Sequence, residues 1–277
     1  MDKLLVCTFS GGRTSAFMAL LVKNLPKYKE YHKVFIFANT GKERPETLDF
    51  VNKCDLEFDL NIVWLEASIV NKKGKGTNYK IVNYQTASRK GEPFKNMLDK
   101  YPLPNNIASN CTRELKLAPI NKYVKSLGYK EVYTAMGIRH DERHRESNTA
   151  KEQKIIYPLI YDLKVDNKFI RNWWSKQRFD LKLKDYEGNC DLCFKKSLKK
   201  RLTIIKENPK VADWWLEMEN EYKQDNTPRF DLRTNISIGK LIEMSKQNFT
   251  KAQDLHELDN KQCDLFEIET DCTCKLD

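Results

Sequence analysis

Residues 3–15 read KLLVCTFSGGRTS, an apolar run that ends in a glycine-rich turn. Residues 3–9 are apolar and rich in β formers, which predicts a buried strand, and residues 16–23 carry apolar side chains at helical spacing. Glycines let several backbone amides point at one anion, and the N-terminus of the helix adds partial positive charge. The pattern predicts a phosphate- or sulfate-binding loop between strand and helix. An ordinary βα turn with an N-cap is the alternative.

The alternation of strand and helix continues through the first half of the chain. Apolar runs at 33–38, 61–65 and 130–136 predict further strands, and residues 45–51 and 114–126 predict helices. Strands that alternate with helices form crossover units. We therefore expect an α/β fold with a mainly parallel twisted sheet and helices on both of its faces.

Two parts of the chain depart from this pattern. Residues 68–110 hold a Lys/Gly run and a proline-rich run, which indicates an insertion with mobile basic loops. After Pro158 four segments suit helices, namely 169–177, 192–206, 211–222 and 238–249. We expect a ligand-binding α/β domain over residues 1–165 and a helical, Cys-containing extension over residues 166–277.

Composition narrows the class of partner. The 277 residues include 49 Lys and Arg against 39 Asp and Glu, a formal charge of +10 that favours a nucleotide, sulfate, phosphate or nucleic acid, although a solubilising surface explains it equally well. No apolar run approaches the roughly 18 residues of a membrane span, so no membrane partner is expected. Residues 10–13 interrupt the apolar start, so a signal peptide is not expected either. Eight cysteines then indicate the cytoplasm, where thiols are buried, catalytic or metal-bound.

Five motifs in order resemble the phosphoadenylyl-sulfate (PAPS) reductase family of the PP-loop adenine nucleotide alpha-hydrolase superfamily, including its phage and DNA-phosphorothioation relatives. They are SGGRTS at 10–15, NTGKE with PET at 39–47, CTRELK at 111–116 with Pro119, GIRHDE at 137–142 with Arg145, and GNCDLCF at 188–194. The resemblance implies an adenine nucleotide alpha-hydrolase-like fold and an enzyme that uses ATP or adenylyl sulfate in sulfur chemistry. It implies nucleotide contacts at Ser10, Gly11, Gly12, Arg13, Thr14, Ser15, Asn39, Thr40, Gly41, Glu43, Arg113, Gly137, Arg139, Asp141 and Arg145.

Cations gather where the parallel strands are expected to end. Arg113, Lys116, Arg139 and Arg145 lie in or beside segments that follow strands, and open α/β sheets bind ligands at that edge. Guanidinium groups match the oxygens of phosphate and sulfate. We predict that Arg139 and Lys116 take part in catalysis. The alternative is a solvated helix start in which acidic neighbours pair with the arginines.

The cysteines form a second group. Cys190 and Cys193 have the spacing at which two thiolates reach one metal or cluster, and the basic residues 195–201 favour the thiolate form. We expect Cys111 as a third ligand, and Cys272 or Cys274 as a fourth ligand or as the catalytic nucleophile. A [4Fe-4S] cluster is the expected cofactor. Zinc, a redox dithiol and inert thiols remain alternatives, and Mg²⁺ is a further candidate beside the nucleotide.

Two reactions are open. In the first, ATP adenylates an acceptor, which could be a nucleic acid, and sulfur from a cysteine, a cluster or a donor protein replaces the AMP. In the second, a tail thiolate attacks adenylyl sulfate and a thiol reductant protein then releases sulfite. Thr14 stands where related ATP pyrophosphatases usually carry a magnesium-binding Asp, and residues 269–274 read ETDCTC without the Gly and His of the reductase tail. A nucleic-acid-binding protein without chemistry and a metal-stabilised scaffold are further alternatives.

Two patterns suit nucleic acid as well as ordinary structure. The tryptophan pairs at 173–174 and 214–215 could stack on bases, but their position on predicted helices favours core packing. The basic run at 195–201 could hold a phosphate backbone or form a solvated helix face.

Overall fold

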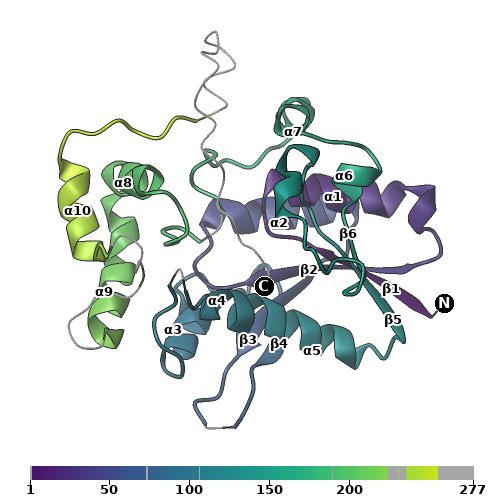
Figure 1. The fold of residues 1–277 in the computed structure, drawn as a ribbon, viewed down its shortest axis with the longest axis horizontal. Helices are drawn as coiled ribbons and strands as arrows, with labels where there is room; N and C mark the ends of the chain where they lie inside the picture. Colours follow the sequence, from purple (N-terminus) through teal and green to yellow (C-terminus); the bar gives the residue numbers. More distant parts are fainter. Residues whose placement is uncertain are drawn as a thin grey trace.

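The computed structural model describes residues 2–72, 74–105, 107–188, 190–223, 230 and 235–254. Its centre is a sheet of six strands in the order β4-β3-β2-β1-β5-β6 (Figure 1). The strands are β1 (Lys3–Thr8), β2 (His32–Asn39), β3 (Val63–Ser68), β4 (Asn78–Val82), β5 (Glu131–Ala135) and β6 (Ile155–Ile156). All neighbouring pairs are parallel except β3 and β4. The predicted mainly parallel sheet is confirmed.

Helices connect the strands and dominate the chain beyond β6. They are α1 (Arg13–Asn24), α2 (Pro45–Phe58), α3 (Glu92–Leu98), α4 (Asn110–Thr112), α5 (Ala118–Ser126), α6 (Pro158–Tyr161), α7 (Asn167–Trp174), α8 (Leu198–Glu207), α9 (Asp213–Tyr222) and α10 (Ile238–Lys246). Short 3₁₀ turns lie at Pro26–Tyr28, His140–Arg145 and Pro209–Ala212, and a π-helical turn at Arg113–Leu117 joins α4 to α5. Among the described helices, none combines the length and the apolar character that crossing a bilayer requires.

Alternate residues of the strands send their side chains to opposite faces of the sheet. On one face, Leu5 and Cys7 of β1 join a core with α1, α2 and α7. On the other face, Leu4 and Val6 pack with residues of α5. Helices therefore cover both faces of the sheet (Figure 1).

The segment predicted as an insertion with mobile basic loops contains regular structure. Residues 78–82 form the edge strand β4, which pairs with β3, and residues 92–98 form α3. The alternation of apolar residues in β4 is weak, because one edge strand with four of its five side chains at least partly exposed needs little apolar sequence. The segment is therefore part of the sheet and of its cover.

The helical extension packs against the sheet domain in two places. Trp174 and Leu181 belong to the core that includes α1 and α2. Helices α8, α9 and α10 form a second core with α3, in which Phe94 and Trp215 are buried. Figure 1 shows α8–α10 gathered at one end of the molecule. Residues on both sides of position 165 thus share one core, and the division into domains at that position stays a prediction.

One predicted helix starts later than its sequence pattern suggested. Residues 192–197 form turns, and α8 begins at Leu198 because the hydroxyl of Ser197 accepts a hydrogen bond from the Lys200 amide and caps the helix. This leaves Cys190 and Cys193 on a loop rather than at the first turn of a helix.

Candidate functional site

The loop at residues 10–15 folds tightly over the start of α1. Gly11 has a φ of +84°, and a Cβ there would lie 2.5 Å from Cγ2 of Thr47, so the position requires glycine. The hydroxyl of Ser15 accepts hydrogen bonds from the Ser10 amide at 3.1 Å and from the Ser10 hydroxyl at 3.0 Å. Gly12 occupies the N-cap position without a side chain that caps the helix. The amides at the start of α1 are therefore open to an anion.

Replacing Gly11 tests this account of the loop. We expect Gly11→Ala to destabilise the protein by about 2–4 kcal/mol, because the added methyl group meets Thr47 in a backbone region that disfavours L side chains. Urea unfolding of the variant measures the change. Gly76→Ala is the matched control, since a Cβ at Gly76 meets nothing within 4 Å and its effect should be small. Equal midpoints for the two variants would contradict the tight packing of the loop.

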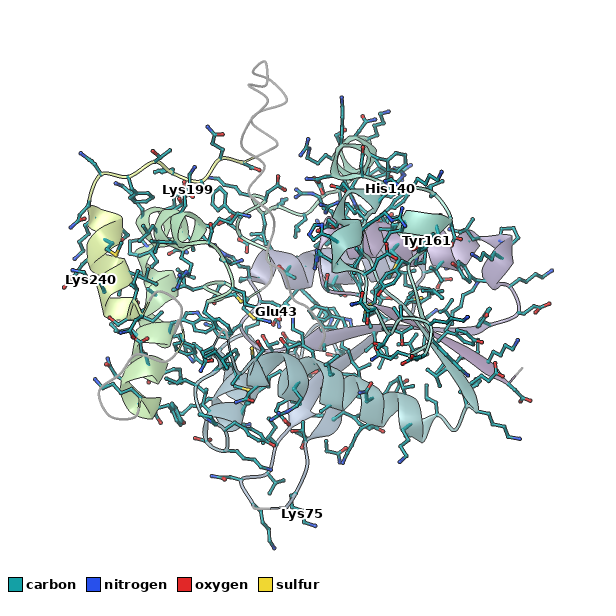
Figure 2. All side chains as sticks on the ribbon, viewed as in Figure 1. Glu43, Lys75, His140, Tyr161, Lys199 and Lys240 are labelled. Carbon is teal, nitrogen blue, oxygen red and sulfur yellow. The ribbon has the colours of Figure 1, made fainter. Side chains whose placement is uncertain are left out.

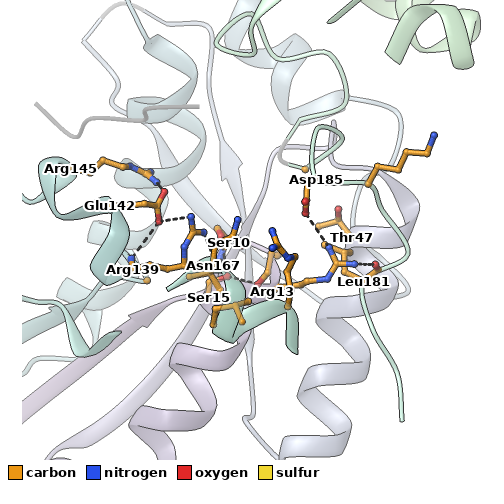
Figure 3. A pocket seen from close by; sticks show the side chains of 18 residues that line it. Ser10, Arg13, Ser15, Thr47, Arg139, Glu142, Arg145, Asn167, Leu181 and Asp185 are labelled. Atoms are coloured by element: carbon orange, nitrogen blue, oxygen red, sulfur yellow. Dashed lines mark hydrogen bonds and ion pairs between the residues drawn. The ribbon is translucent and has the colours of Figure 1, made fainter. Parts of the chain in front are cut away.

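A polar cavity of about 240 Å³ lies over this loop (Figure 3). Its cations are Arg13, Arg139, Arg145, Arg171 and Lys184, and its acids are Glu142 and Asp185. The Arg139 guanidinium donates a hydrogen bond to the Thr14 hydroxyl at 3.3 Å and lies 3.4 Å from the Glu142 carboxylate. Glu142 also pairs with Arg145. The arginines are thus held at the rim of the loop, where they could contact a phosphate or sulfate.

Gly137 brings the loop after β5 close to the loop after β1. A Cβ at Gly137 would lie 3.3 Å from Cα of Ser15, which is tighter than ordinary van der Waals contact. The absence of a side chain therefore allows the segment that carries Arg139 to approach the start of α1. Gly137 also lines the polar cavity.

Arg13 lines the polar cavity, but its guanidinium points to the C-terminal extension. Its Nε donates to the Asp180 carboxylate at 2.7 Å, and Nη2 donates to the Leu181 carbonyl at 2.6 Å. The Trp174 indole in turn donates to the Arg13 carbonyl at 3.0 Å. Arg13 thereby ties residues 180–185 to the loop, which makes the extension one wall of the cavity.

An apolar cavity of about 290 Å³ adjoins the polar one. Seven apolar side chains line it: Phe9, Ile36, Ala38, Leu117, Ile120, Met136 and Ile138. The two cavities share Ser10, Ser15, Gly137 and Arg145. Together they join an apolar compartment to the polar one, with Arg145 where the two meet.

Three of the predicted cysteine ligands line the apolar cavity. Cys111 lies in α4, and Cys190 and Cys193 lie on the loop before α8. Lys116 and Lys195 line the same cavity. Among the residues that the structure describes, no three His, Cys, Asp or Glu side chains are grouped closely enough to hold a metal ion. Cys272 and Cys274 lie outside the described residues.

The Cys190 thiol is held in a specific environment. Its sulfur lies 3.5 Å from the Thr40 hydroxyl, and Cys190 forms an isolated antiparallel bridge with Glu43. Burial first, and then the Glu43 carboxylate, raise the pKa of this thiol well above its usual value, while Lys116 acts in the opposite direction. The free thiol is therefore protonated at neutral pH.

The motif after β2 supports the site more than it lines it. Only Thr40 of this motif lines the apolar cavity. Asn39 is buried, and its side-chain amide donates to the Glu66 carboxylate at 2.7 Å and to the Ser88 carbonyl at 2.8 Å. Glu43, in the middle of the molecule in Figure 2, accepts hydrogen bonds from the Thr40 amide and hydroxyl, each at 2.8 Å. Its other carboxylate oxygen lies 3.9 Å from the Lys116 ammonium.

Gly41 shapes this turn. It has a φ of +79°, and a Cβ there would lie 2.7 Å from the Ser88 hydroxyl oxygen. Glycine is therefore needed for both conformation and space, which is a role in shaping the loop and not a contact in either cavity.

Besides Asn39, Gly41 and Glu43, two further predicted nucleotide contacts, Arg113 and Asp141, line neither cavity. The Arg113 side chain is 61% exposed, pairs with Glu114 and lies over the Tyr101 ring. Asp141 pairs with Arg139 near the rim. The sequence motif alone did not distinguish these residues from Arg139 and Arg145.

Sequence reasoning missed the wall that the extension supplies. The residues of this wall are Asn167, Ile170, Arg171, Leu181, Lys184, Asp185 and Gly188. Thr47 of α2 lines the same cavity and was not predicted as a contact either. Single cations such as Arg171 and Lys184 carry no motif. The packing of α7 against α1 places Arg171, and the contacts of Arg13 with residues 180–183 place Lys184.

The tryptophans and the basic run have structural roles. Trp174 and Trp215 are almost fully buried, which confirms core packing for these two. In the basic run, Lys196 and Arg201 are buried as well. The run is therefore not a continuous solvated face.

A family model and two relatives match this chain. The model of the phosphoadenosine phosphosulfate reductase domain matches residues 4–155. An uncharacterized nin region protein of Escherichia phage lambda is 34% identical over 200 residues, which cover 70% of this chain and 67% of the phage protein. An uncharacterized protein of Methanocaldococcus jannaschii is 31% identical over 161 residues, 55% of this chain but only 32% of the archaeal protein.

One solved structure is similar at lower identity. It is the crystal structure of phosphoadenylyl-sulfate (PAPS) reductase from Candida auris in a phosphate complex. The match has 16% sequence identity and a TM-score of 0.39, and it covers 62% of this chain and 71% of that one.

Proposed function

Because the chain belongs to the phosphoadenosine phosphosulfate reductase domain family, we propose that it binds an adenine nucleotide across the two joined cavities and carries out sulfur chemistry on it. The observation that carries this proposal is the junction of the cavities, where an anion-binding loop meets an apolar compartment lined by three cysteines. Anion, base and sulfur could therefore be held within one continuous space.

The charged end of the nucleotide belongs over the loop at 10–15. The amides at the start of α1 and the guanidinium groups of Arg139 and Arg145 supply positive charge there. The nucleoside belongs in the apolar cavity, between side chains of the β1–β2–β5 edge and of the α5 segment such as Ile36 and Ile120. This placement puts the bond between nucleoside and anion near Arg145.

The reaction that we favour is ATP-dependent sulfur transfer. An acceptor oxygen attacks the α-phosphorus of ATP and pyrophosphate leaves, after which a sulfur nucleophile displaces AMP from the activated acceptor. Arg139, Arg145 and Lys116 would stabilise the negative charge that builds up on the phosphate oxygens. The basic surplus of the chain is compatible with a nucleic-acid acceptor.

The second reaction uses adenylyl sulfate. A thiolate of Cys272 or Cys274 attacks the sulfur of the sulfate, AMP leaves, and a thiol reductant releases sulfite from the thiosulfonate. The two cysteines near the C-terminus support this reaction, whereas the lack of the Gly and His of the reductase tail supports the first. Nucleic-acid binding without chemistry is the third possibility.

The cysteines of the apolar cavity are the ligand type that an iron-sulfur cluster uses, but in this structure they are not grouped closely enough to hold a single metal ion. Thiolates are the usual protein ligands of such clusters and of zinc, and Cys111, Cys190 and Cys193 face one cavity. These three residues would hold the group, with Cys272 or Cys274 as a fourth ligand. When bound, a cluster held by these three residues alone would supply a place for sulfur, whereas a fourth ligand would close that place. Loading it would release the proton that burial keeps on Cys190.

Product analysis separates the reactions. We expect isothermal titration to detect binding of ATP, and pyrophosphate to form from ATP when an acceptor and a sulfur donor are present. Sulfite formed from adenylyl sulfate and a thiol would favour the reductase. Salt-sensitive binding of nucleic acid without any nucleotide binding would contradict the proposal and favour the third possibility.

A further inference from the structure

The Cys-x-x-Cys loop lies beside the loop that follows β2. Cys190 forms an antiparallel bridge with Glu43, and the Asp191 amide donates to the Lys42 carbonyl at 2.9 Å. Residues 40 and 190, which line the same cavity, are thus fixed next to one another although 150 positions separate them in the sequence. This backbone contact involves few residues, so side-chain interactions must determine how often the two loops separate.

The Asp191 carboxylate joins three segments at this contact. Its Oδ1 accepts hydrogen bonds from the Trp215 indole at 2.7 Å and from the Leu192 amide at 2.9 Å. Its Oδ2 lies 3.1 Å from the Lys42 ammonium. The Lys42 and Asp191 side chains are only 9% and 14% exposed, so this ion pair is shielded from water. Loss of either partner would leave a charge buried without compensation.

Lys42 is held on its other side by an aromatic ring. Its ammonium lies 4.5 Å from the centre of the Trp214 ring. Gly91 lets the chain pass close to the same ring, because a Cβ there would lie 2.8 Å from it. The pair thus connects the loop after β2, the cysteine loop and α9, three segments that local sequence does not bring together.

We propose that Asp191 and Lys42 are positioning residues that hold Cys190 and Cys193 against the nucleotide cavity. Neither residue lines the polar or the apolar cavity, so each acts through Cys190 and Cys193, which lie on either side of Asp191 in the sequence. The role of these residues in catalysis rests on the proposed function. The contacts themselves are present in the protein without nucleotide and can be tested there.

Site-resolved alkylation tests the proposal. The full chain, free of metal and nucleotide, is treated with iodoacetamide, and the rate at each cysteine is read by peptide mass spectrometry. We expect Asp191→Asn and Lys42→Met each to raise the rate at Cys190 by about tenfold, because the loop opens more often once the pair is broken. The double variant should react no faster than either single variant, since the two residues act as a unit.

Two controls keep the outcome decisive. Cys54, fully buried in α2, should stay unreactive unless the whole protein unfolds. Glu221→Gln on α9 removes an exposed ion pair with Lys95 and should leave the rate at Cys190 unchanged. If Cys54 also reacts in Asp191→Asn, that variant unfolds as a whole. The rate at Cys190 is then measured in the milder Lys42→Gln variant.

Two results would overturn the proposal. One is an unchanged Cys190 rate in folded Lys42 and Asp191 variants. The other is a double variant in which the two accelerations multiply, because the residues would then act independently. Failure of the proposed function gives a different result, since absent nucleotide binding leaves the alkylation pattern of the free protein as expected here.

Discussion

Gly12→Val should weaken binding of ATP or adenylyl sulfate by at least about a hundredfold while the protein stays folded. Gly12 has an extended backbone, with φ −103° and ψ 163°, that a β-branched residue adopts readily. A Cβ there meets only the Ser10 hydroxyl oxygen, at 3.9 Å, so the core does not oppose the change. The valine would instead occupy the polar cavity over the amides that are expected to bind the anion.

Isothermal titration gives the affinity, and thermal unfolding shows whether the fold is kept. Gly76→Val, in open space away from both cavities, is the matched control and should bind nucleotide like the unchanged protein. Gly12→Ala should have an intermediate effect because its methyl group fills less of the cavity. Unchanged affinity in Gly12→Val would show that the loop at 10–15 is not the anion site.

Cys190→Ser should lower the iron and acid-labile sulfide of anaerobically prepared protein by at least about tenfold. Loss of a supporting contact to a metal ligand already costs about 10–100-fold in metal affinity, and this change removes a ligand. Cys190 is chosen because it lines the apolar cavity and its sulfur contacts the Thr40 hydroxyl. Cys54→Ala, in the core of α2, should keep the wild-type content.

The double change Cys272→Ser with Cys274→Ser then shows whether these two cysteines of the C-terminal tail act as nucleophile or as cluster ligand. Loss of turnover with an intact cluster would identify the tail as the nucleophile, and loss of the cluster would identify it as a ligand. Wild-type iron and activity in Cys190→Ser would falsify the cluster hypothesis and reduce the three cavity cysteines to ordinary thiols.

The parts of the site that lie within one βα unit were predictable. The strand, the glycine turn and the helix at residues 3–23 follow one another directly, and local periodicity and backbone freedom determine each of them. The position of Arg139 was predictable for the same reason, because it follows a recognisable strand, whereas Gly137 came from the family resemblance. The edge strand β4 was not, since its short and largely exposed sequence carries little apolar pattern.

The roles of individual side chains in the motifs were less predictable. Arg13 and Arg139 both belong to matching motifs, yet the Arg13 guanidinium binds Asp180 whereas Arg139 contacts Thr14. Asn39 and Gly41 likewise shape the chain behind the cavity. A motif identifies a position in the fold, but the direction of a long side chain depends on the partners that packing supplies.

By itself, the sequence determined the α/β class and the strand, glycine turn and helix near the start of the chain, because each depends on residues close together in the chain. Tertiary structure alone decided that Cys111, Cys190 and Cys193 line one cavity, that Arg171 and Lys184 of the extension complete the polar cavity, and that Asp191 pairs with Lys42. These contacts join segments far apart in the sequence. They form only when burial of the shared apolar cores offsets the conformational entropy of bringing such segments together.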